Sequence, residues 1–186
     1  MATIHNTTLA PTKLELLTGW LPMQPWYRAG ETAPRLERAG GFRLDDPAGE
    51  VGIELMVVTD GAGAGTAYFT PLTYRGAPLE EAAAGLIGTL EHGVLGTRWV
   101  YDAQHDPVAV AQLLAFVTGS VEAQHQSESD TLDPSVGRTW DGGAPGAVEL
   151  VRVPEPGAPA TARGSVEVSW TRPDGSTARG VVAVVR

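Results

Sequence analysis

The segment Tyr101-Asp-Ala-Gln-His-Asp106 gathers the side chains best suited to chemistry in this chain of 186 residues. Asp102, His105 and Asp106 place two carboxylates and an imidazole within five residues, but a catalytic or metal site would need further ligands from elsewhere. The other imidazoles are those of His5, His92 and His125. The alternative is that Asp106 caps a helix beginning at Pro107, while Asp102 and His105 satisfy backbone groups of a loop. The residue pattern favours this capping interpretation.

A second candidate is the aromatic segment from Leu16 to Arg28, which contains Trp20, Trp26 and Tyr27. Such rings bury large areas and take specific orientations. Either they fill the core of the chain itself, or they present an aromatic surface to a sugar or a protein. We interpret Trp20 and Trp26 as structural, which leaves Arg28 and the neighbouring loops as contact points.

Other motifs indicate neither catalysis nor a cofactor. The glycine run Gly61-Ala-Gly-Ala-Gly65 leads into the strand residues Tyr68 and Phe69, whereas phosphate loops lead into a helix. We therefore interpret it as a hairpin loop. The segment His125–Asp130 is interpreted as a solvated loop, and the sequence contains neither G-x-S-x-G nor H-E-x-x-H. We predict no catalytic residues, no metal ligands and no cofactor.

The composition excludes several classes of protein. The formal net charge is −9, from 22 acidic and 13 basic residues, which disfavours binding to nucleic acid. Cysteine is absent, so disulfides and thiolate sites are excluded. No secretion signal or run of apolar residues long enough to span a membrane is visible, so a cytoplasmic protein is expected.

Two helices are predicted from their first residues. Thr12 and Glu15 have the spacing of a capping box, and Gly19 and Pro22 are expected to end that helix. The pair Asp106-Pro107 predicts the start of a second helix. The second helix is expected to continue to residue 118, and one or two helical turns are expected within residues 78–89.

Alternating apolar residues predict an α+β fold in one domain, residues 1–186, with a curved antiparallel sheet of about six or seven strands and two or three packed helices. The expected strands are 36–45, 50–59, 66–74, 97–101, 148–153, 165–171 and 176–185, with a possible short strand at 2–5. Pro71 requires a sheet edge or a bulge. Residues 119–162 are expected to be rich in loops, and residues 163–186 to form a hairpin.

Four motifs resemble the N-terminal cap of actinobacterial maltokinases. They are Trp20-Leu-Pro-Met-Gln-Pro-Trp-Tyr27, Phe69-Thr-Pro-Leu-Thr-Tyr-Arg75, Leu86-Ile-Gly-Thr-Leu90 and Val100-Tyr-Asp-Ala-Gln-His-Asp-Pro107. The resemblance covers residues up to about 118 and implies a cystatin-like curved antiparallel sheet with packed helices, which the C-terminal hairpin would extend. Maltokinases phosphorylate maltose in the route from trehalose to α-glucan. Their catalytic loop H-x-D-x-x-x-x-N has no counterpart in residues 119–186.

The resemblance therefore implies a non-catalytic cap-like module that binds a partner protein or a sugar of trehalose, maltose or α-glucan metabolism. The alternative is a small carbohydrate-active enzyme or sugar-binding protein that uses the loop Tyr101–Asp106. A third possibility is a structural protein that forms oligomers through an exposed sheet edge near Pro71. The candidate contact residues are Trp20, Trp26, Tyr27, Arg28, Tyr101, Asp102, His105 and Asp106.

Overall fold

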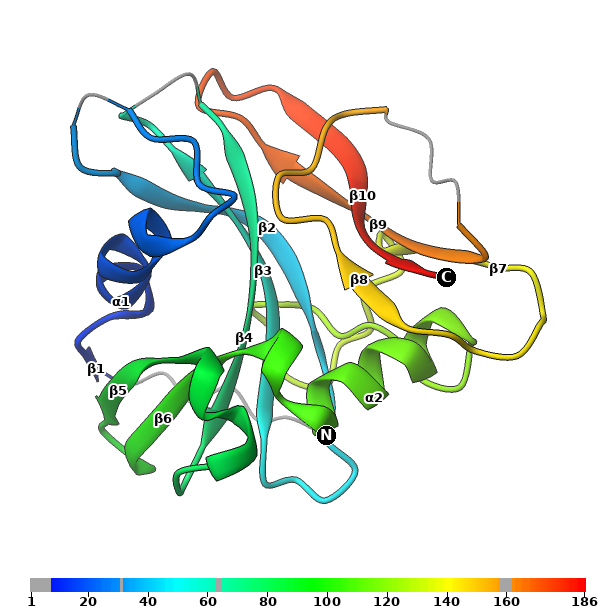
Figure 1. Cartoon of the computed structure of the whole chain (residues 1–186), viewed down its shortest axis with the longest axis horizontal. Helices are drawn as coiled ribbons and strands as arrows, with labels where there is room; N and C mark the ends of the chain where they lie inside the picture. The colour runs from blue at the N-terminus through cyan, green and yellow to red at the C-terminus, as the bar shows by residue number, and fades with distance from the viewer. Residues whose placement is uncertain (1–7, 31, 63–64, 158–161) are drawn as a thin grey trace.

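The computed structural model describes residues 8–30, 32–62, 65–157 and 162–186. Within them the chain forms one strongly curved antiparallel sheet with helices on both of its faces (Figure 1). The predicted α+β class is confirmed. The sheet has ten strands in the described residues, so the prediction of six or seven was too low.

The helices are α1 (Lys13–Trp20) and α2 (Pro107–Val117), with three short 3₁₀ helices η1 (Leu21–Met23), η2 (Glu80–Gly85) and η3 (Ala103–His105). The strands are β1 (Leu9–Ala10), β2 (Leu36–Leu44), β3 (Gly52–Asp60), β4 (Ala67–Arg75), β5 (Leu86–His92), β6 (Gly96–Asp102), β7 (Gly137–Trp140), β8 (Val148–Leu150), β9 (Gly164–Thr171) and β10 (Thr177–Val185). Their order in the sheet is β1-β5-β6-β4-β3-β2-β9-β10-β8, and β7 pairs with β9.

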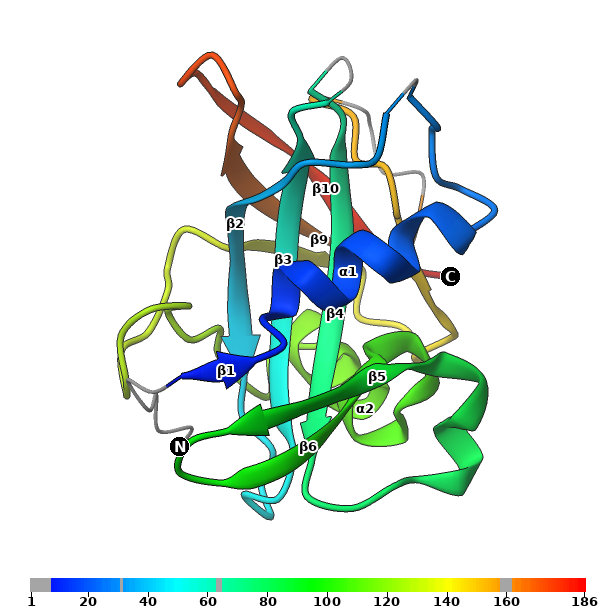
Figure 2. The same cartoon turned by 90° about the vertical axis from the view of Figure 1, so that its left-hand side faces the viewer.

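Alternation along β3 explains why helices cover both faces of the sheet. Ile53, Leu55 and Val57 point into one core, which α2 covers together with β9 and β10. Met56 and Val58 point into a second core, which α1 covers. Figure 2 shows α1 in front of β3 and β4, with α2 behind them. The predicted burial of both faces of this strand is confirmed.

The C-terminal hairpin extends the sheet, as the family resemblance implied. β9 pairs with β10, and it joins β2 where Gly40 lies opposite Trp170. A Cβ atom at Gly40 would lie 2.5 Å from the carbonyl oxygen of Ser169, so only glycine allows the two backbones to approach this closely. From this contact between β2 and β9, the C-terminal strands turn over the core that contains α2.

The edge of β4 explains why this strand contains a proline. β3 pairs with nearly the whole of β4, but β6 pairs with β4 only from Leu72 onward. On that side no described strand pairs with Pro71, so the missing N–H of this proline breaks no hydrogen bond of the sheet. This agrees with the predicted edge position. The edge is not exposed, however, because Pro71 is buried and the N–H of Phe69 donates to the carbonyl of Arg152 at 2.9 Å. The prediction of an exposed edge near Pro71 was wrong.

Both predicted helix starts are confirmed. The Thr12 hydroxyl accepts from the N–H of Glu15 at 3.2 Å, and the N–H of Thr12 donates to the Glu15 carboxylate at 2.7 Å. Gly19 lies inside α1 and does not end it, because α1 runs directly into η1, in which Pro22 occupies the first turn. Proline is tolerated there because its missing N–H has no partner to lose.

Three strands within the described residues were not predicted, and the shortest of them is β1 (Leu9–Ala10), which pairs with β5. Leu86–His92 forms β5 after the predicted helical turn, which is a 3₁₀ helix over Glu80–Gly85. Gly137–Trp140 forms β7 inside a region predicted as loop, because it pairs with β9. The strand considered near residues 2–5 lies outside the described residues.

Candidate functional site

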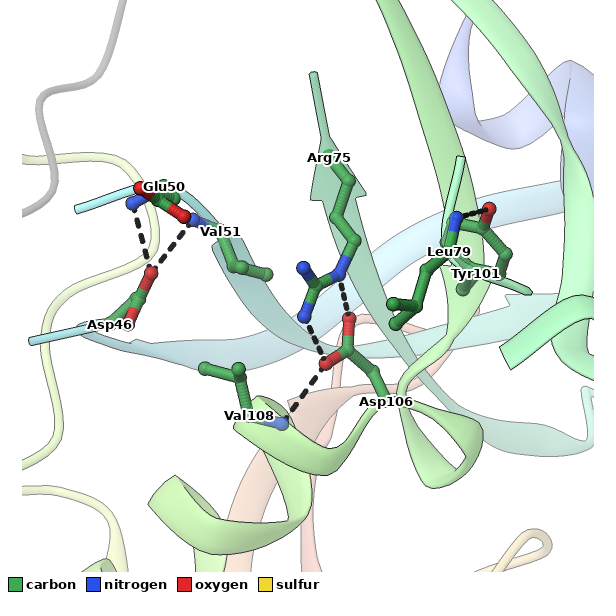
Figure 3. Close-up of polar contacts among 8 residues, drawn as sticks. All are labelled: Asp46, Glu50, Val51, Arg75, Leu79, Tyr101, Asp106 and Val108. Atoms are coloured by element: carbon green, nitrogen blue, oxygen red, sulfur yellow. Dashed lines mark hydrogen bonds and ion pairs between the residues drawn. The ribbon is translucent and has the colours of Figure 1, made fainter. Parts of the chain in front are cut away.

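Asp106 is the most buried carboxylate of the candidate loop, with a relative exposure of 0%. Its Oδ1 accepts from the N–H of Val108 at 3.0 Å, which caps α2, and both oxygens accept from the Arg75 guanidinium, at 2.7 and 2.8 Å (Figure 3). Burial alone would raise the pKa of Asp106, but the hydrogen bonds and charge of Arg75 outweigh it and lower that pKa. Asp106 therefore fixes the start of α2 to the end of β4.

Asp102 has a second arginine partner. Its Oδ2 accepts from Nη2 of Arg152 at 2.5 Å, and its Oδ1 accepts from the N–H of Gln104 at 3.4 Å, which caps η3. The same Nη2 donates to Oε1 of Gln104 at 2.9 Å. The predicted cap by Asp106 and the predicted hydrogen bond of Asp102 to a loop backbone group thus agree with the structure, and each carboxylate also forms an ion pair.

The other two members of the loop have different surroundings. Tyr101 is buried, and its hydroxyl accepts from the N–H of Leu79 at 2.8 Å (Figure 3). His105 is exposed and packs against Gly85 of η2. Among the described residues, no group of three or more His, Asp or Glu is arranged to hold a metal ion.

The aromatic rings of the segment from Leu16 to Arg28 face one another and the sheet. The Trp20 and Trp26 ring centroids lie 5.8 Å apart with an interplanar angle of 63°, and Trp26 lies 6.1 Å from Tyr68. Tyr27 lies 5.6 Å from Tyr68, and its hydroxyl is 3.3 Å from a carboxylate oxygen of Asp60. Trp20 is only 8% exposed, whereas Trp26 and Tyr27 are partly exposed. These rings pack mainly with one another rather than forming an open platform.

Arg28 is the exposed member of this segment. Its guanidinium lies 3.4 Å from the carboxylate of Glu155, and both side chains are more than half exposed. Its backbone N–H donates to the Tyr68 hydroxyl at 3.2 Å. This bond holds the backbone of Arg28 and does not involve its guanidinium group. The Arg28 side chain is thus available at the surface.

Arg152 joins the two candidate groups, and the sequence interpretation did not include it. Its guanidinium carbon lies 5.2 Å from the centroid of the Trp26 ring, while Nη2 binds Asp102 and Gln104. Its side chain is only 11% exposed. Nothing local in the sequence marks this arginine, because its hydrogen-bond partners Asp102 and Gln104 are 50 and 48 residues away.

Glu54 is a further buried charge that the sequence interpretation did not single out. It is 4% exposed, and its carboxylate forms an ion pair with Lys13. The Tyr74 hydroxyl donates to it at 2.8 Å and the Gln126 amide at 3.0 Å. Burial alone would raise the pKa of Glu54, but Lys13 and these hydrogen bonds lower it. The cluster fixes α1 and the segment around Gln126 to the sheet.

A small apolar crevice, with a cavity volume of about 20 Å³, lies between β4, α2 and β8. Its walls include Pro71, Leu113 and Leu150, and Gln104 is a polar residue at its lining. Sugar sites need several convergent polar groups as well as apolar surface. This mainly aliphatic lining does not supply them.

Comparison with known families identifies part of the chain. Residues 20–106 match the family model of the maltokinase N-terminal cap domain, and they make up a little under half of the 186 residues. A search of curated proteins finds no match. None of the described helices is long and apolar enough to cross a membrane. The matched segment contains β2 to β6 and both members of the Arg75–Asp106 pair, whereas Arg152 lies beyond it. Residues 20–106 of this chain are therefore similar to the maltokinase N-terminal cap domain.

Proposed function

We propose that this chain is a non-catalytic cap-like module that binds a partner protein of trehalose, maltose or α-glucan metabolism in the cytoplasm. The family match supports the cap-like part of this proposal. The metabolic setting follows from the name of that family. Binding, rather than turnover, is supported by the surroundings of the reactive side chains.

The observation that carries the proposal is the use of both loop carboxylates in the fold. Asp106 is fully buried against Arg75, and Asp102 is 7% exposed against Arg152. A general acid or base must be able to reach the proton that it transfers. These two carboxylates are instead held by guanidinium groups and by helix caps, so neither is free for such a step.

A protein partner is favoured over a sugar by the arrangement of the aromatic rings. Sugar binding would use an open ring face, but Trp26 faces Arg152, Trp20 and Tyr68. The chain also carries a net charge of −9, which attracts positively charged surfaces over distances near the Debye length of about 10 Å. A basic segment of a protein fits this charge.

Activity assays on the pure protein test the proposal. With ATP, Mg²⁺ and maltose we expect no maltose phosphate and no ATP hydrolysis above buffer, and calorimetry should detect no binding of maltose or trehalose. Turnover that disappears in a folded Asp102→Asn variant, but persists in Asp141→Asn, would overturn the proposal. Asp141 is the matched control because it also pairs with an arginine, Arg163, but lies in an exposed loop.

A further inference from the structure

We call residues 20–106 the cap region. Three of its side-chain groups surround the Arg152 guanidinium as a receptor would surround an arginine. The Asp102 carboxylate accepts a hydrogen bond at 2.5 Å, and the Gln104 amide oxygen accepts another at 2.9 Å. The Trp26 ring lies against the guanidinium, 5.2 Å from its carbon atom. The carboxylate and the aromatic face match the charge and the planar shape of arginine, and both oxygens accept from Nη2, whereas Nη1 is buried without a hydrogen-bond partner among the described residues.

The receptor and its occupant come from different parts of the chain. Trp26, Asp102 and Gln104 all lie within residues 20–106, the segment that matches the cap family. Arg152 lies in the segment after β8, residues 151–157, which we call the strap. The strap also supplies a backbone contact to the cap region, because the Arg152 carbonyl accepts from the N–H of Phe69 at 2.9 Å. The site therefore binds both a side chain and an extended backbone.

The rest of the strap is attached by contacts of mixed strength. Val153 packs against the core under α1, and Pro154 is buried. Glu155 reaches Arg28 at 3.4 Å with both side chains largely exposed, and exposed pairs of this kind contribute little to stability. Gly157 donates to the carbonyl of Arg179 at 3.3 Å. Arg152 thus makes the main polar attachment of the strap to the cap region.

We infer that the cap region carries a binding site for an arginine in an extended segment of a partner protein, and that Arg152 occupies this site within the chain. The inference rests on the proposed function as a protein-binding module and names the chemistry of its partner. Residues 20–106 contain twelve acidic and six basic residues, so the region attracts a cationic segment. The partner's arginine replaces that of Arg152, and its backbone replaces the strap along the edge of β4.

Occupation by the strap sets how strongly a free partner binds. An intramolecular segment competes at an effective concentration in the millimolar range, on the order of 1 mM. The wild-type chain therefore binds an isolated segment weakly, and removal of the Arg152 side chain exposes the receptor. A partner of the wild-type chain needs additional contacts to displace the strap.

A peptide with the sequence of residues 147–156, AVELVRVPEP, tests the site because it contains the natural occupant. Fluorescence anisotropy measures its Kd for the full-length wild type and for the full-length Arg152→Ala variant. We expect the variant to bind at least about tenfold more tightly, since its receptor lacks a competing arginine. A peptide with citrulline in place of arginine keeps the shape but lacks the charge, and it should bind at least about tenfold more weakly to the variant.

Arg163→Ala is the matched control variant. Arg163 also lies over a tryptophan, Trp140, at 5.7 Å and pairs with an aspartate, Asp141. It lies outside the cap region, so this variant should bind the peptide no better than the wild type does. Adding Asp102→Asn to Arg152→Ala should remove the gained affinity.

Circular dichroism confirms the fold of each variant, and Arg152→Gln is measured in parallel because it retains a polar side chain beside Asp102. Failure of every folded Arg152 variant to prefer the arginine peptide over the citrulline peptide would overturn the inference. Binding of the peptide by Arg163→Ala as tightly as by Arg152→Ala would overturn the inference as well. Failure of the proposed function is distinguishable, because it appears as turnover of ATP or a sugar whatever the peptide affinity.

Discussion

Two arginine–aspartate pairs hold the two ends of the loop Tyr101–Asp106, but they connect different regions. The Arg75–Asp106 pair lies wholly inside the segment that matches the cap family, and it joins β4 to the start of α2. The Arg152–Asp102 pair joins that segment to the strap. The comparison indicates that the first pair belongs to the fold of the cap region, whereas the second attaches a neighbouring segment to it.

The first pair also explains two of the motifs that carry the family resemblance. Arg75 ends the motif that begins at Phe69, and Asp106 lies at the end of the motif that begins at Val100. Their bidentate contact requires both residues, because a buried charge without its partner is strongly destabilising. The spacing of these motifs therefore reflects a structural contact.

Asp106→Ala is expected to have the largest effect on stability. The change leaves Arg75 without its partner and removes the cap of α2, which together should lower the free energy of unfolding by about 4 kcal/mol. Urea denaturation followed by circular dichroism measures it. Asp106→Asn keeps an acceptor for the cap of α2, so its free energy of unfolding should decrease less. A loss below about 1 kcal/mol for Asp106→Ala would show that the pair is not part of the fold.

Arg152→Ala should have a smaller effect, because it removes an attachment between regions. We expect a loss of about 2 kcal/mol, the usual range for hydrogen bonds to a charged group, since Asp102 is left buried without an ion-pair partner. The control is Arg163→Ala, whose side chain is 42% exposed and whose loss should cost less than about 1 kcal/mol. Equal losses in the two variants would contradict the structural role of Arg152.

Acid should destabilise the cap region through Asp106 and Glu54. The folded pKa of each lies below its ordinary value, so the stabilisation is present above about pH 4.5 and is lost as the pH falls through the folded pKa. The free energy of unfolding, measured from pH 7 to pH 2, should therefore decrease below about pH 4.5. Glu54→Gln should reduce this decrease. An identical pH dependence in that variant would exclude Glu54 as a contributor.

Arg28→Ala should have the smallest effect on stability. Its pair with Glu155 is 3.4 Å long and largely exposed, so the free energy of unfolding should change by less than about 0.5 kcal/mol. Thermal unfolding monitored by tryptophan fluorescence provides the measurement. A loss comparable to that of Arg152→Ala would contradict the assignment of Arg152 as the main polar attachment of the strap.

Local sequence signals predicted the helices and the C-terminal hairpin. The Thr12–Glu15 box and the Asp106-Pro107 pair act within a few residues, so their geometry is encoded where they occur. The turn between β9 and β10 is similarly local, with Pro173 and Gly175 near its centre. The family resemblance added the cap region and its curved sheet.

The remaining features depend on contacts between distant segments. β5 follows an Ala- and Glu-rich stretch, and it becomes a strand because β6 pairs with it. β7 is a strand because β9 lies beside it. Arg152 meets Asp102 across 50 residues, and no spacing rule connects the two. The candidate loop was therefore recognisable from the sequence, but the arginines that hold its carboxylates were not.

A double-mutant cycle between Arg75 and Asp106 tests most directly whether the loop carboxylates serve the fold. The cycle compares Arg75→Met, Asp106→Asn and the double variant with the wild type by urea denaturation. We predict a coupling energy of about 2 kcal/mol, because the buried bidentate contact disappears once in each single variant and cannot be lost again in the double variant. Additive effects, with a coupling energy near zero, would contradict a structural role for Asp106.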